Sequence, residues 1–174
     1  DRQRAKAESN LQTIFDNTSE GFILVDRNGI VNTFNAKTAQ TILLNTDLDI
    51  TIGSSIYDFV HPSRKDSYEG ILSNVLAGET MQYDYAYERK NGDTKWFSFT
   101  LNPAYSRSGD IEGVCITSAD ITQRKEAEQK LYESETFNKG VLSSLSSHIA
   151  VIDERGTLIA VNKAWNDFAL SLIH

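Results

Sequence analysis

The sequence predicts an α+β fold in which five antiparallel strands form one sheet with helices packed on one face. Two observations lead to this prediction. Two apolar runs near the start of the chain, Phe22–Asp26 and Ile30–Phe34, flank an Asn-Gly turn, which is the strongest short-range signal for a β-hairpin. After a helical stretch, three more apolar runs follow one another across glycine-containing turns, and strands connected in this way pair antiparallel.

The helices are predicted from the spacing of apolar residues and from their end signals. Residues 1–16 are expected to form a helix that flanks the fold, because apolar residues recur there at helical intervals. These residues are Ala7, Leu11, Ile14 and Phe15. Asn35 is expected to cap a short helix over residues 36–44. A longer helix is expected to hold Pro62 in its first turn and to end at Gly78.

Three strands are expected next, at Thr80–Arg89, Thr94–Ala104 and Ile111–Ile121, with turns at Asn91-Gly92 and Ser108-Gly109. They complete the sheet that the first hairpin begins.

The last strand passes directly into a charged helical segment. Asp120 lies where its carboxylate would accept from the first free N–H groups of a helix, and Gln123 would reach back as in a capping box. We therefore expect a signalling helix over residues 123–146 that leaves the sheet.

A short pattern then repeats at a constant offset of 127 residues: Asp26, Gly29 and Asn35 recur as Asp153, Gly156 and Asn162. The chain therefore starts its fold a second time. Residues 17–122 are predicted to form one complete domain, and residues 147–174 are predicted to be the truncated start of a second.

Several short motifs cover nearly the whole chain. They are Asp26-Arg-Asn-Gly-Ile30 with Asn35, Ile52-Gly53, Val60-His-Pro62, Ala77-Gly-Glu79, Arg89-Lys-Asn-Gly92 with Trp96, Gly113, and Asp120-Ile-Thr with Arg124-Lys125. Together they resemble the PAS (Per-Arnt-Sim) sensory domain of bacterial and archaeal multidomain signalling proteins. The resemblance implies that Asp120, Thr122 and Arg124 couple the last strand to the outgoing helix. Two features depart from the family's pattern: Ser63-Arg-Lys follows His-Pro where the family more usually has Glu-Asp, and the second copy is incomplete.

Composition and motifs argue against several classes of function. A net charge of −7 argues against broad contact with nucleic acid or anionic membranes, both of which use clustered Lys and Arg. The single cysteine excludes an internal disulfide and fits a reducing compartment, and no apolar run approaches the roughly 20 residues of a membrane span. The motifs of phosphate-binding loops, metalloproteases, serine hydrolases and kinases are missing from the sequence. We therefore expect a non-catalytic, cytoplasmic segment of a protein that is itself cytoplasmic or tethered to a membrane.

Tyr83, Tyr85 and Tyr87, together with Trp96, form the candidate ligand site. Buried Tyr and Trp carry polar groups that need partners and can orient a small molecule of unidentified structure. The alternative is that these side chains pack the sheet against the N-terminal helix.

No metal, haem or flavin is predicted. His61 precedes Pro62 at a helix start, whereas haem-binding relatives place their histidine within the long helix. Cys115 lies on the last strand instead of the helical Gly-x-Asn-Cys setting of the light-sensing relatives. His148 begins a strand and lacks the surroundings of a phosphoacceptor.

The linker carries apolar and small polar residues at alternating spacings of four and three, which predicts a coiled-coil seam between two copies of the chain. The seam residues are Ala127, Leu131, Ser134, Asn138, Val141 and Leu145. Ser134 and Asn138 weaken the seam, which suits a helix pair that shifts between two arrangements. The alternative is an exposed linker helix of a monomer.

The sequence therefore predicts a sensory module. A small molecule or another cue would act on the complete domain, and a homodimeric helix would pass the change to an effector in the same chain, such as a histidine kinase or a diguanylate cyclase. The alternatives are a ligand-free dimerisation and spacer module, and a light- or redox-active domain.

Overall fold

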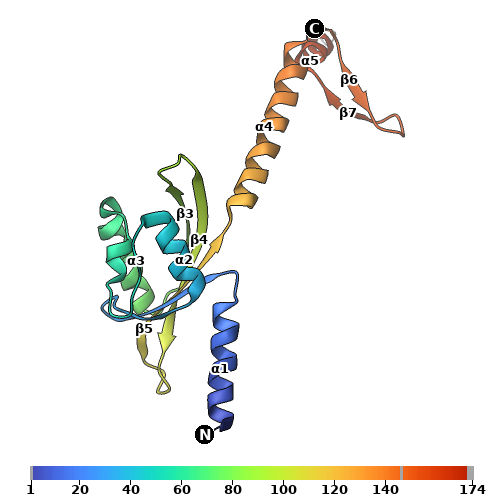
Figure 1. The fold of residues 1–174 in the computed structure, drawn as a ribbon. Helices are drawn as coiled ribbons and strands as arrows, with labels where there is room; N and C mark the ends of the chain where they lie inside the picture. The colour runs from blue at the N-terminus through green and yellow to red at the C-terminus, as the bar shows by residue number, and fades with distance from the viewer. Residues whose placement is uncertain (1, 146, 172–174) are drawn as a thin grey trace. The chain divides into compact units, whose positions relative to one another are not determined.

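The computed structural model describes residues 2–145 and 147–171, and contacts divide the chain into two units, Asp1–Gln123 and Arg124–His174 (Figure 1). The first unit contains a five-stranded sheet and the second a two-stranded sheet. The predicted end of the linker at residue 146, and residues 172–174 of the predicted second copy, lie outside the described residues.

The first unit has the predicted α+β architecture. Its elements are α1 (Arg2–Asp16), β1 (Gly21–Asp26), β2 (Val31–Phe34), α2 (Ala36–Thr46), the 3-10 turns η1 (Ile56–Phe59) and η2 (Pro62–Arg64), α3 (Lys65–Leu76), β3 (Met81–Glu88), β4 (Thr94–Tyr105) and β5 (Ile111–Asp120). The strand order is β2-β1-β5-β4-β3, and every neighbouring pair is antiparallel. The predicted five-stranded antiparallel sheet is therefore confirmed.

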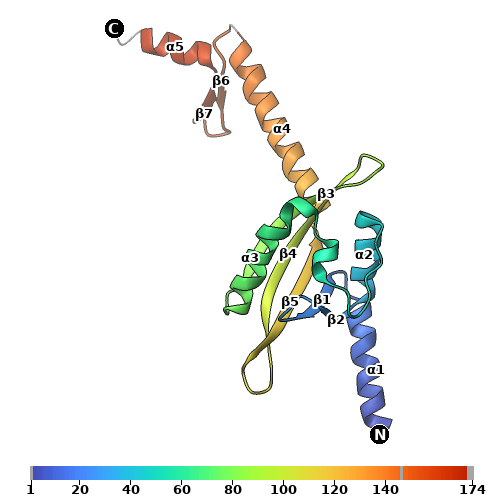
Figure 2. The ribbon, with the colours of Figure 1, turned by 90° about the vertical axis from the view of Figure 1, so that its left-hand side faces the viewer.

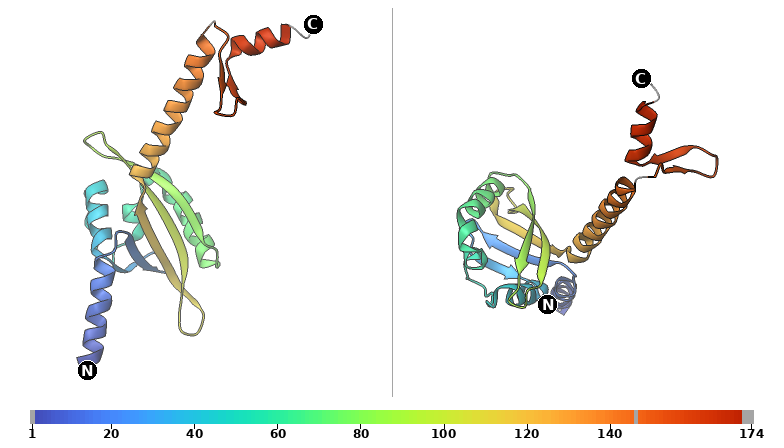
Figure 3. Two further views of the ribbon diagram at one scale, coloured as in Figure 1. Left: turned by 90° about the vertical axis from the view of Figure 1, so that its right-hand side faces the viewer. Right: turned by 90° about the horizontal axis from the view of Figure 1, so that it is seen from above.

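The segment between β2 and β3 connects the two edges of the sheet and covers one of its faces. Figure 2 shows α2 and α3 in front of the strands, and the left view of Figure 3 shows the opposite side. The core lies between this layer and the sheet. Fully buried Val25, Leu101 and Val114 from the sheet pack there with Val75 of α3.

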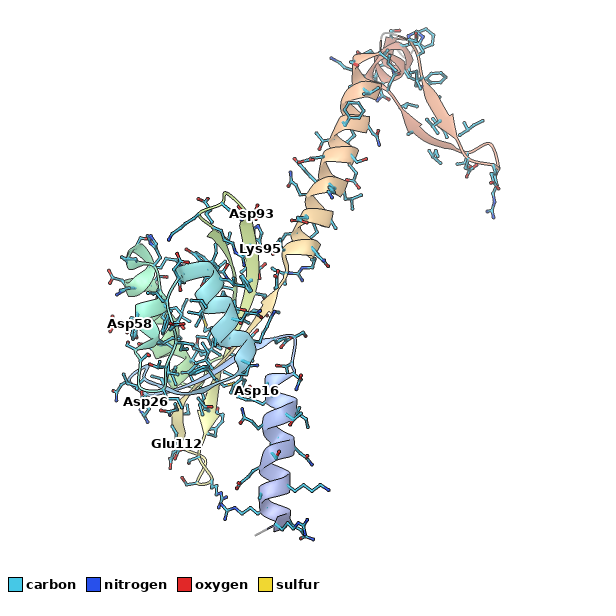
Figure 4. The ribbon with its side chains drawn as sticks, viewed as in Figure 1. Asp16, Asp26, Asp58, Asp93, Lys95 and Glu112 are labelled. Carbon is cyan, nitrogen blue, oxygen red and sulfur yellow. The ribbon has the colours of Figure 1, made fainter. Side chains whose placement is uncertain are left out.

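Asn35 caps α2, as predicted, and it also bonds to α1 and β1. Its Oδ1 accepts from the Thr38 N–H at 3.0 Å, which caps α2, and from the Phe22 N–H of β1 at 3.0 Å. Its Nδ2 donates to the Phe15 carbonyl of α1 at 3.1 Å. The carboxylate of Asp16, labelled in Figure 4, accepts from the Ala36 N–H at 3.1 Å. The bonds of Asn35 and Asp16 hold the end of α1 against the start of α2.

The start of the long helix differs from the prediction. Pro62 lies in the separate turn η2, and α3 begins only at Lys65. The predicted helix end is confirmed, because Gly78 follows α3 with a φ of +103°, a left-handed conformation that favours glycine.

The second unit repeats the beginning of the first. It contains α4 (Thr122–Ser144), whose first two residues belong to the first unit, and then β6 (Ala150–Ile152), β7 (Leu158–Val161) and α5 (Lys163–Ser171). Strands β6 and β7 pair antiparallel as a hairpin. Because α4 ends at Ser144, the predicted seam residue Leu145 lies just beyond the helix.

Candidate functional site

The inner face of the first sheet and the helical layer enclose a cavity of about 70 Å³. Its wall combines apolar side chains with hydroxyl groups and one arginine. The lining residues are Ile23, Thr38, Thr41, Ile42, Asn45, Thr46, Ile56, Phe59, Val60, His61, Arg64, Tyr68, Tyr83, Tyr85, Tyr87, Phe99, Ile116 and Ser118. A more open hollow of about 670 Å³ shares Phe59, His61, Tyr85 and Tyr87 with this cavity, which marks the side from which a ligand could enter.

The structure brings three of the predicted ligand residues, Tyr83, Tyr85 and Tyr87, together on the cavity wall. Alternate residues of a strand point to the same face, so their spacing of two places all three inward. Tyr83 stacks on Phe99 at 5.4 Å between ring centroids, and Tyr87 meets Phe97 edge-on at 5.8 Å.

The fourth predicted ligand residue, Trp96, does not line the cavity. Its neighbour Phe97 is buried and packs on Tyr87, so strand alternation directs Trp96 to the other face of the sheet. The alternative was that these side chains pack the sheet against the N-terminal helix, but the structure places the three tyrosines on the cavity wall. The ring contact of α1 with the sheet is instead made by Phe15 on Phe22, at 4.9 Å.

Two further residues of this site, Arg64 and Tyr68, were not predicted. The guanidinium carbon of Arg64 lies 4.0 Å from the ring centroid of Tyr85 and 5.2 Å from that of Tyr83. Tyr68 of α3 is buried and meets Tyr57 edge-on at 5.9 Å. The only sequence signal for Arg64 was the unusual Ser63-Arg-Lys that follows His-Pro.

Three of the cavity tyrosines, Tyr68, Tyr83 and Tyr87, remain protonated at neutral pH. Burial raises the pKa of Tyr68 well above its usual value, and the neighbouring phenols Tyr83 and Tyr87 add to the shift. Burial likewise raises the pKa of Tyr83 and of Tyr87, while the charge of Arg64 opposes the shift in both. Their hydroxyl groups are therefore available as hydrogen-bond donors.

A polar clamp holds α2 against the end of β3 at the cavity wall. Arg89 donates from Nε to the Asn45 Oδ1 at 2.8 Å, and Asn45 itself lines the cavity. Lys90 forms an ion pair with Asp47, the residue that caps the carboxyl end of α2. Movement of α2 relative to the sheet would require these contacts to change.

His61 caps the turn η2. Its Nδ1 accepts from the Ser63 N–H at 3.3 Å, so it precedes this 3-10 turn and not the long helix α3, at whose start it was predicted. Cys115 is half-buried on β5, where burial raises the pKa of its thiol. Within the described residues there is no cluster of three or more His, Cys, Asp and Glu side chains that could hold a metal ion.

The second candidate site is the joint between the sheet and α4. The Trp96 N–H of β4 donates to the Thr122 Oγ1 at 3.0 Å, and the Ile121 N–H donates to the Trp96 carbonyl at 2.8 Å. Asp120 accepts the Thr122 N–H through Oδ1 at 2.9 Å. Thr122 is buried, so the joint connects β4, β5 and the first residue of α4 through a covered hydroxyl group.

The capping arrangement differs by one residue from the prediction. Because α4 starts at Thr122, Asp120 precedes the N-cap position and Gln123 is only the second helical residue, which does not fit the predicted capping box. Burial raises the pKa of Asp120, but the hydrogen bonds from Thr122 and the positive charges of Lys95 (Figure 4) and Lys37 lower it. The lowering effects are larger, so the pKa of Asp120 lies below its usual value. The contribution of this carboxylate to stability is therefore present at neutral pH and is lost as the pH falls through its lowered pKa.

The remaining predicted linker residues are exposed on α4. Arg124 lies 3.7 Å from Glu128 in a pair four residues apart, measured from Nε to Oε1. Among the predicted seam residues, Leu131 is 62% exposed and Val141 is 41% exposed, while Ala127 and Asn138 are also exposed. The apolar stripe of α4 is therefore uncovered in a single copy of the described chain.

Residues 15–126, well over half of the 174, match the family model described as the PAS fold. The chain belongs to the PAS family. The matched segment contains both the cavity and the joint, so the resemblance that the motifs indicated is confirmed for the first unit as a PAS sensory domain.

Two curated relatives are much longer than this chain. A 104.1 kDa protein from Rhodobacter capsulatus is 25% identical over 168 residues, which cover 94% of this chain and 16% of that protein. Phytochrome E of Ipomoea nil is 27% identical over 142 residues, covering 74% of this chain and 12% of the phytochrome. The chain thus spans less than a fifth of either relative.

Solved structures support the same fold. The PAS domain of an HTR-like protein from Haloarcula marismortui is 18% identical, has a TM-score of 0.53, and aligns over 69% of this chain and 96% of that domain. An RNA-binding Light-Oxygen-Voltage receptor is also similar, with 16% identity, a TM-score of 0.55, and coverage of 78% of this chain and 38% of the receptor. Because an RNA-binding receptor shares this fold, the fold gives no support to the predicted absence of nucleic-acid partners, which rests on charge alone.

No helix in the described part of the chain is long and apolar enough to span a membrane.

Proposed function

We propose that the chain is the sensory module of a longer signalling protein. A small molecule or another cue acts on the cavity of the complete PAS domain, and the resulting change in the sheet reaches α4. The observation that carries this proposal is the hydrogen-bonded joint of Trp96, Asp120 and Thr122. A strand that moves at this end of the sheet must move the first turn of α4 or break a buried hydrogen bond, which costs on the order of 1–3 kcal/mol.

Under this proposal the effector lies downstream in the same chain and receives the signal through α4. A histidine kinase or a diguanylate cyclase is the proposed effector. The module is placed in the cytoplasm, has no nucleic-acid or membrane contact of its own, and performs no catalysis. The uncovered stripe on α4, together with exposed Leu11 and Ile14 on α1, supports a homodimer through the flanking helices, because burying apolar area is favourable. Light scattering that found a monomer at high micromolar concentration would refute the dimer.

The residue that tests the joint is Asp120. Asp120→Ala removes the acceptor of the Thr122 N–H, and the loss of a bond at a helix start costs about 1 kcal/mol against a domain stability of roughly 5–15 kcal/mol. The variant chain should therefore melt within a few degrees of the unmodified chain. In the longer protein, the effector should stay at one output level whether or not the stimulus is present.

Asp110→Ala is the matched control. Asp110 lies before the other end of β5 and accepts a hydrogen bond from Ser108 in an exposed turn. It should leave both melting and response unchanged. A domain that unfolds with Asp120→Ala would make Asp120 a structural residue, and a normal response would mean that the signal leaves by another route.

A ligand-free spacer module remains the second candidate, and the small size of the cavity favours it. Native mass spectrometry of the purified chain separates the two functions, because a sensor of small molecules retains or takes up a ligand of defined mass.

A further inference from the structure

Arg64 occupies a position that local energetics disfavours for an arginine. It is the N-cap residue of α3, and its side chain makes no capping hydrogen bond. Ser, Thr, Asp or Asn at an N-cap stabilises a helix by about 1 kcal/mol, whereas a cation near the positive end of the helix dipole is unfavourable. Natural sequences break such local rules mainly at functional sites.

The side chain of Arg64 is held over the phenol rings of the cavity. The guanidinium lies over Tyr85 at 4.0 Å and Tyr83 at 5.2 Å, within the range of cation–π attraction. Arg64 is half-buried, and no carboxylate in the described part of the chain lies within ion-pair distance of it. Its planar fork of N–H donors is therefore oriented by the rings without a protein anion to satisfy it.

The charge and polar groups of the cavity wall are complementary to an anion. None of the described residues that line it is acidic, while Arg64, the tyrosines and the hydroxyls of Thr41, Thr46 and Ser118 supply cationic or neutral polar groups. Its volume of about 70 Å³ has room for only about five water molecules at the 10–15 Å³ that each requires. An occupant of the cavity as it stands has on the order of five non-hydrogen atoms.

We propose that this cavity binds a small monocarboxylate of about three or four carbons through Arg64. The guanidinium donates two parallel hydrogen bonds to the carboxylate oxygens, for which its planar fork is suited. The neutral tyrosine hydroxyls donate to the same oxygens, and Ile23, Ile42 and Ile116 contact the short carbon tail. A neutral ligand of the same shape would shield the guanidinium from water without supplying a negative charge to pair with it, and burying an unpaired charge is energetically costly. This inference rests on the proposed sensory function and names its ligand class.

The test is an NMR titration of the 174-residue chain with propionate, its neutral isostere propionamide, and inorganic phosphate. Propionate should shift the amide signals of Arg64, Tyr83 and Tyr85, and propionamide should bind at least about tenfold more weakly, because charge-assisted hydrogen bonds are lost. Arg64→Gln should weaken propionate binding about 10- to 100-fold. Arg107→Gln, the same change in the exposed β4–β5 turn, should have no effect.

A purely structural role for Arg64 predicts a different result. Arg64→Gln removes a cation from a helix start, so the proposal expects the variant to melt at the same temperature as the unmodified chain or higher. Equal affinity for propionate and propionamide, equal affinity for phosphate, or shifts confined to residues away from the cavity would each overturn the carboxylate assignment. The comparison of ligands on the unmodified chain needs no variant to fold.

The two proposals fail separately. A neutral molecule retained in the cavity would overturn the carboxylate class and leave the sensory function intact. A longer protein that responds normally with Asp120→Ala would overturn the route through the joint, whichever ligand the cavity binds.

Discussion

The two copies of the repeated pattern form the same local hydrogen bonds but bury their strands to different degrees. In the first copy, the Asn35 Oδ1 accepts from the N–H groups of Phe22 and Thr38. In the second, the Asn162 Oδ1 accepts from the N–H groups of Ile149 and Trp165, at 3.0 and 3.1 Å. Each of these residues lies 127 positions after its counterpart.

The hairpin turns match as closely. The Asp26 Oδ1 accepts from Asn28 and Ile30, and the Asp153 Oδ1 accepts from the equivalent pair, Arg155 and Thr157. Gly29 and Gly156 have φ values of +78° and +79°. The shared Asp and Gly of the two turns therefore go with the same backbone conformation twice.

Burial separates the copies. Val25 and Val31 are 0% exposed, whereas their counterparts Ile152 and Leu158 are 61% and 52% exposed. Strand β1 pairs with β5 and shares one core cluster with residues of α3, while the described part of the second unit has only the β6–β7 pair. Local hydrogen bonding is thus independent of the rest of the fold, and burial depends on strands and helices that come much later in the chain. This pattern supports the proposal that residues 147–174 begin a second PAS domain.

The largest expected effect is a difference between the two equivalent asparagines, Asn35 and Asn162. Asn35→Ala should lower the free energy of unfolding of the first unit by about 3 kcal/mol or more, because several buried groups lose their partners at once. Asn162→Ala should leave that free energy unchanged. Urea unfolding followed by the fluorescence of Trp96, in a chain carrying Trp165→Phe, reports the first unit alone.

A loss below about 1 kcal/mol with Asn35→Ala would contradict this expectation and would mean that water replaces the lost bonds. An equal loss with Asn162→Ala would mean that the two units unfold together.

A smaller effect should distinguish the two hairpins directly. Val25→Ala removes fully buried methyl groups and should cost about 2 kcal/mol, from lost transfer free energy and the cavity left behind. Ile152→Ala alters a largely exposed side chain and should stay within about 0.5 kcal/mol. Urea unfolding followed by Trp96 for Val25→Ala and by Trp165 for Ile152→Ala measures both. A comparable loss at Ile152 would show that another chain covers the second hairpin in solution.

The functional residues also divide into those whose position follows from the local sequence and those whose position depends on the complete fold. The positions of Tyr83, Tyr85 and Tyr87 on one face could be predicted, because strand alternation needs only their spacing. The inclusion of Trp96 was wrong, since its neighbour Phe97 occupies the inward position. The role of Asp120 was predicted one residue out of register, because helix ends depend on the exact residue at which the strand stops.

By itself, the sequence determined what short stretches decide: the turns at Gly29 and Gly156, the capping role of Asn35, the antiparallel order of the later strands, and the family to which they belong. The tertiary structure alone decided that the Arg64 side chain lies over the rings of a strand about twenty residues away, how large a cavity remains beside it, and which of two similar hairpins is buried. The physical reason is range. A hydrogen bond between residues two to five positions apart forms wherever that sequence occurs, whereas packing depends on the volumes of side chains that only the complete fold brings together.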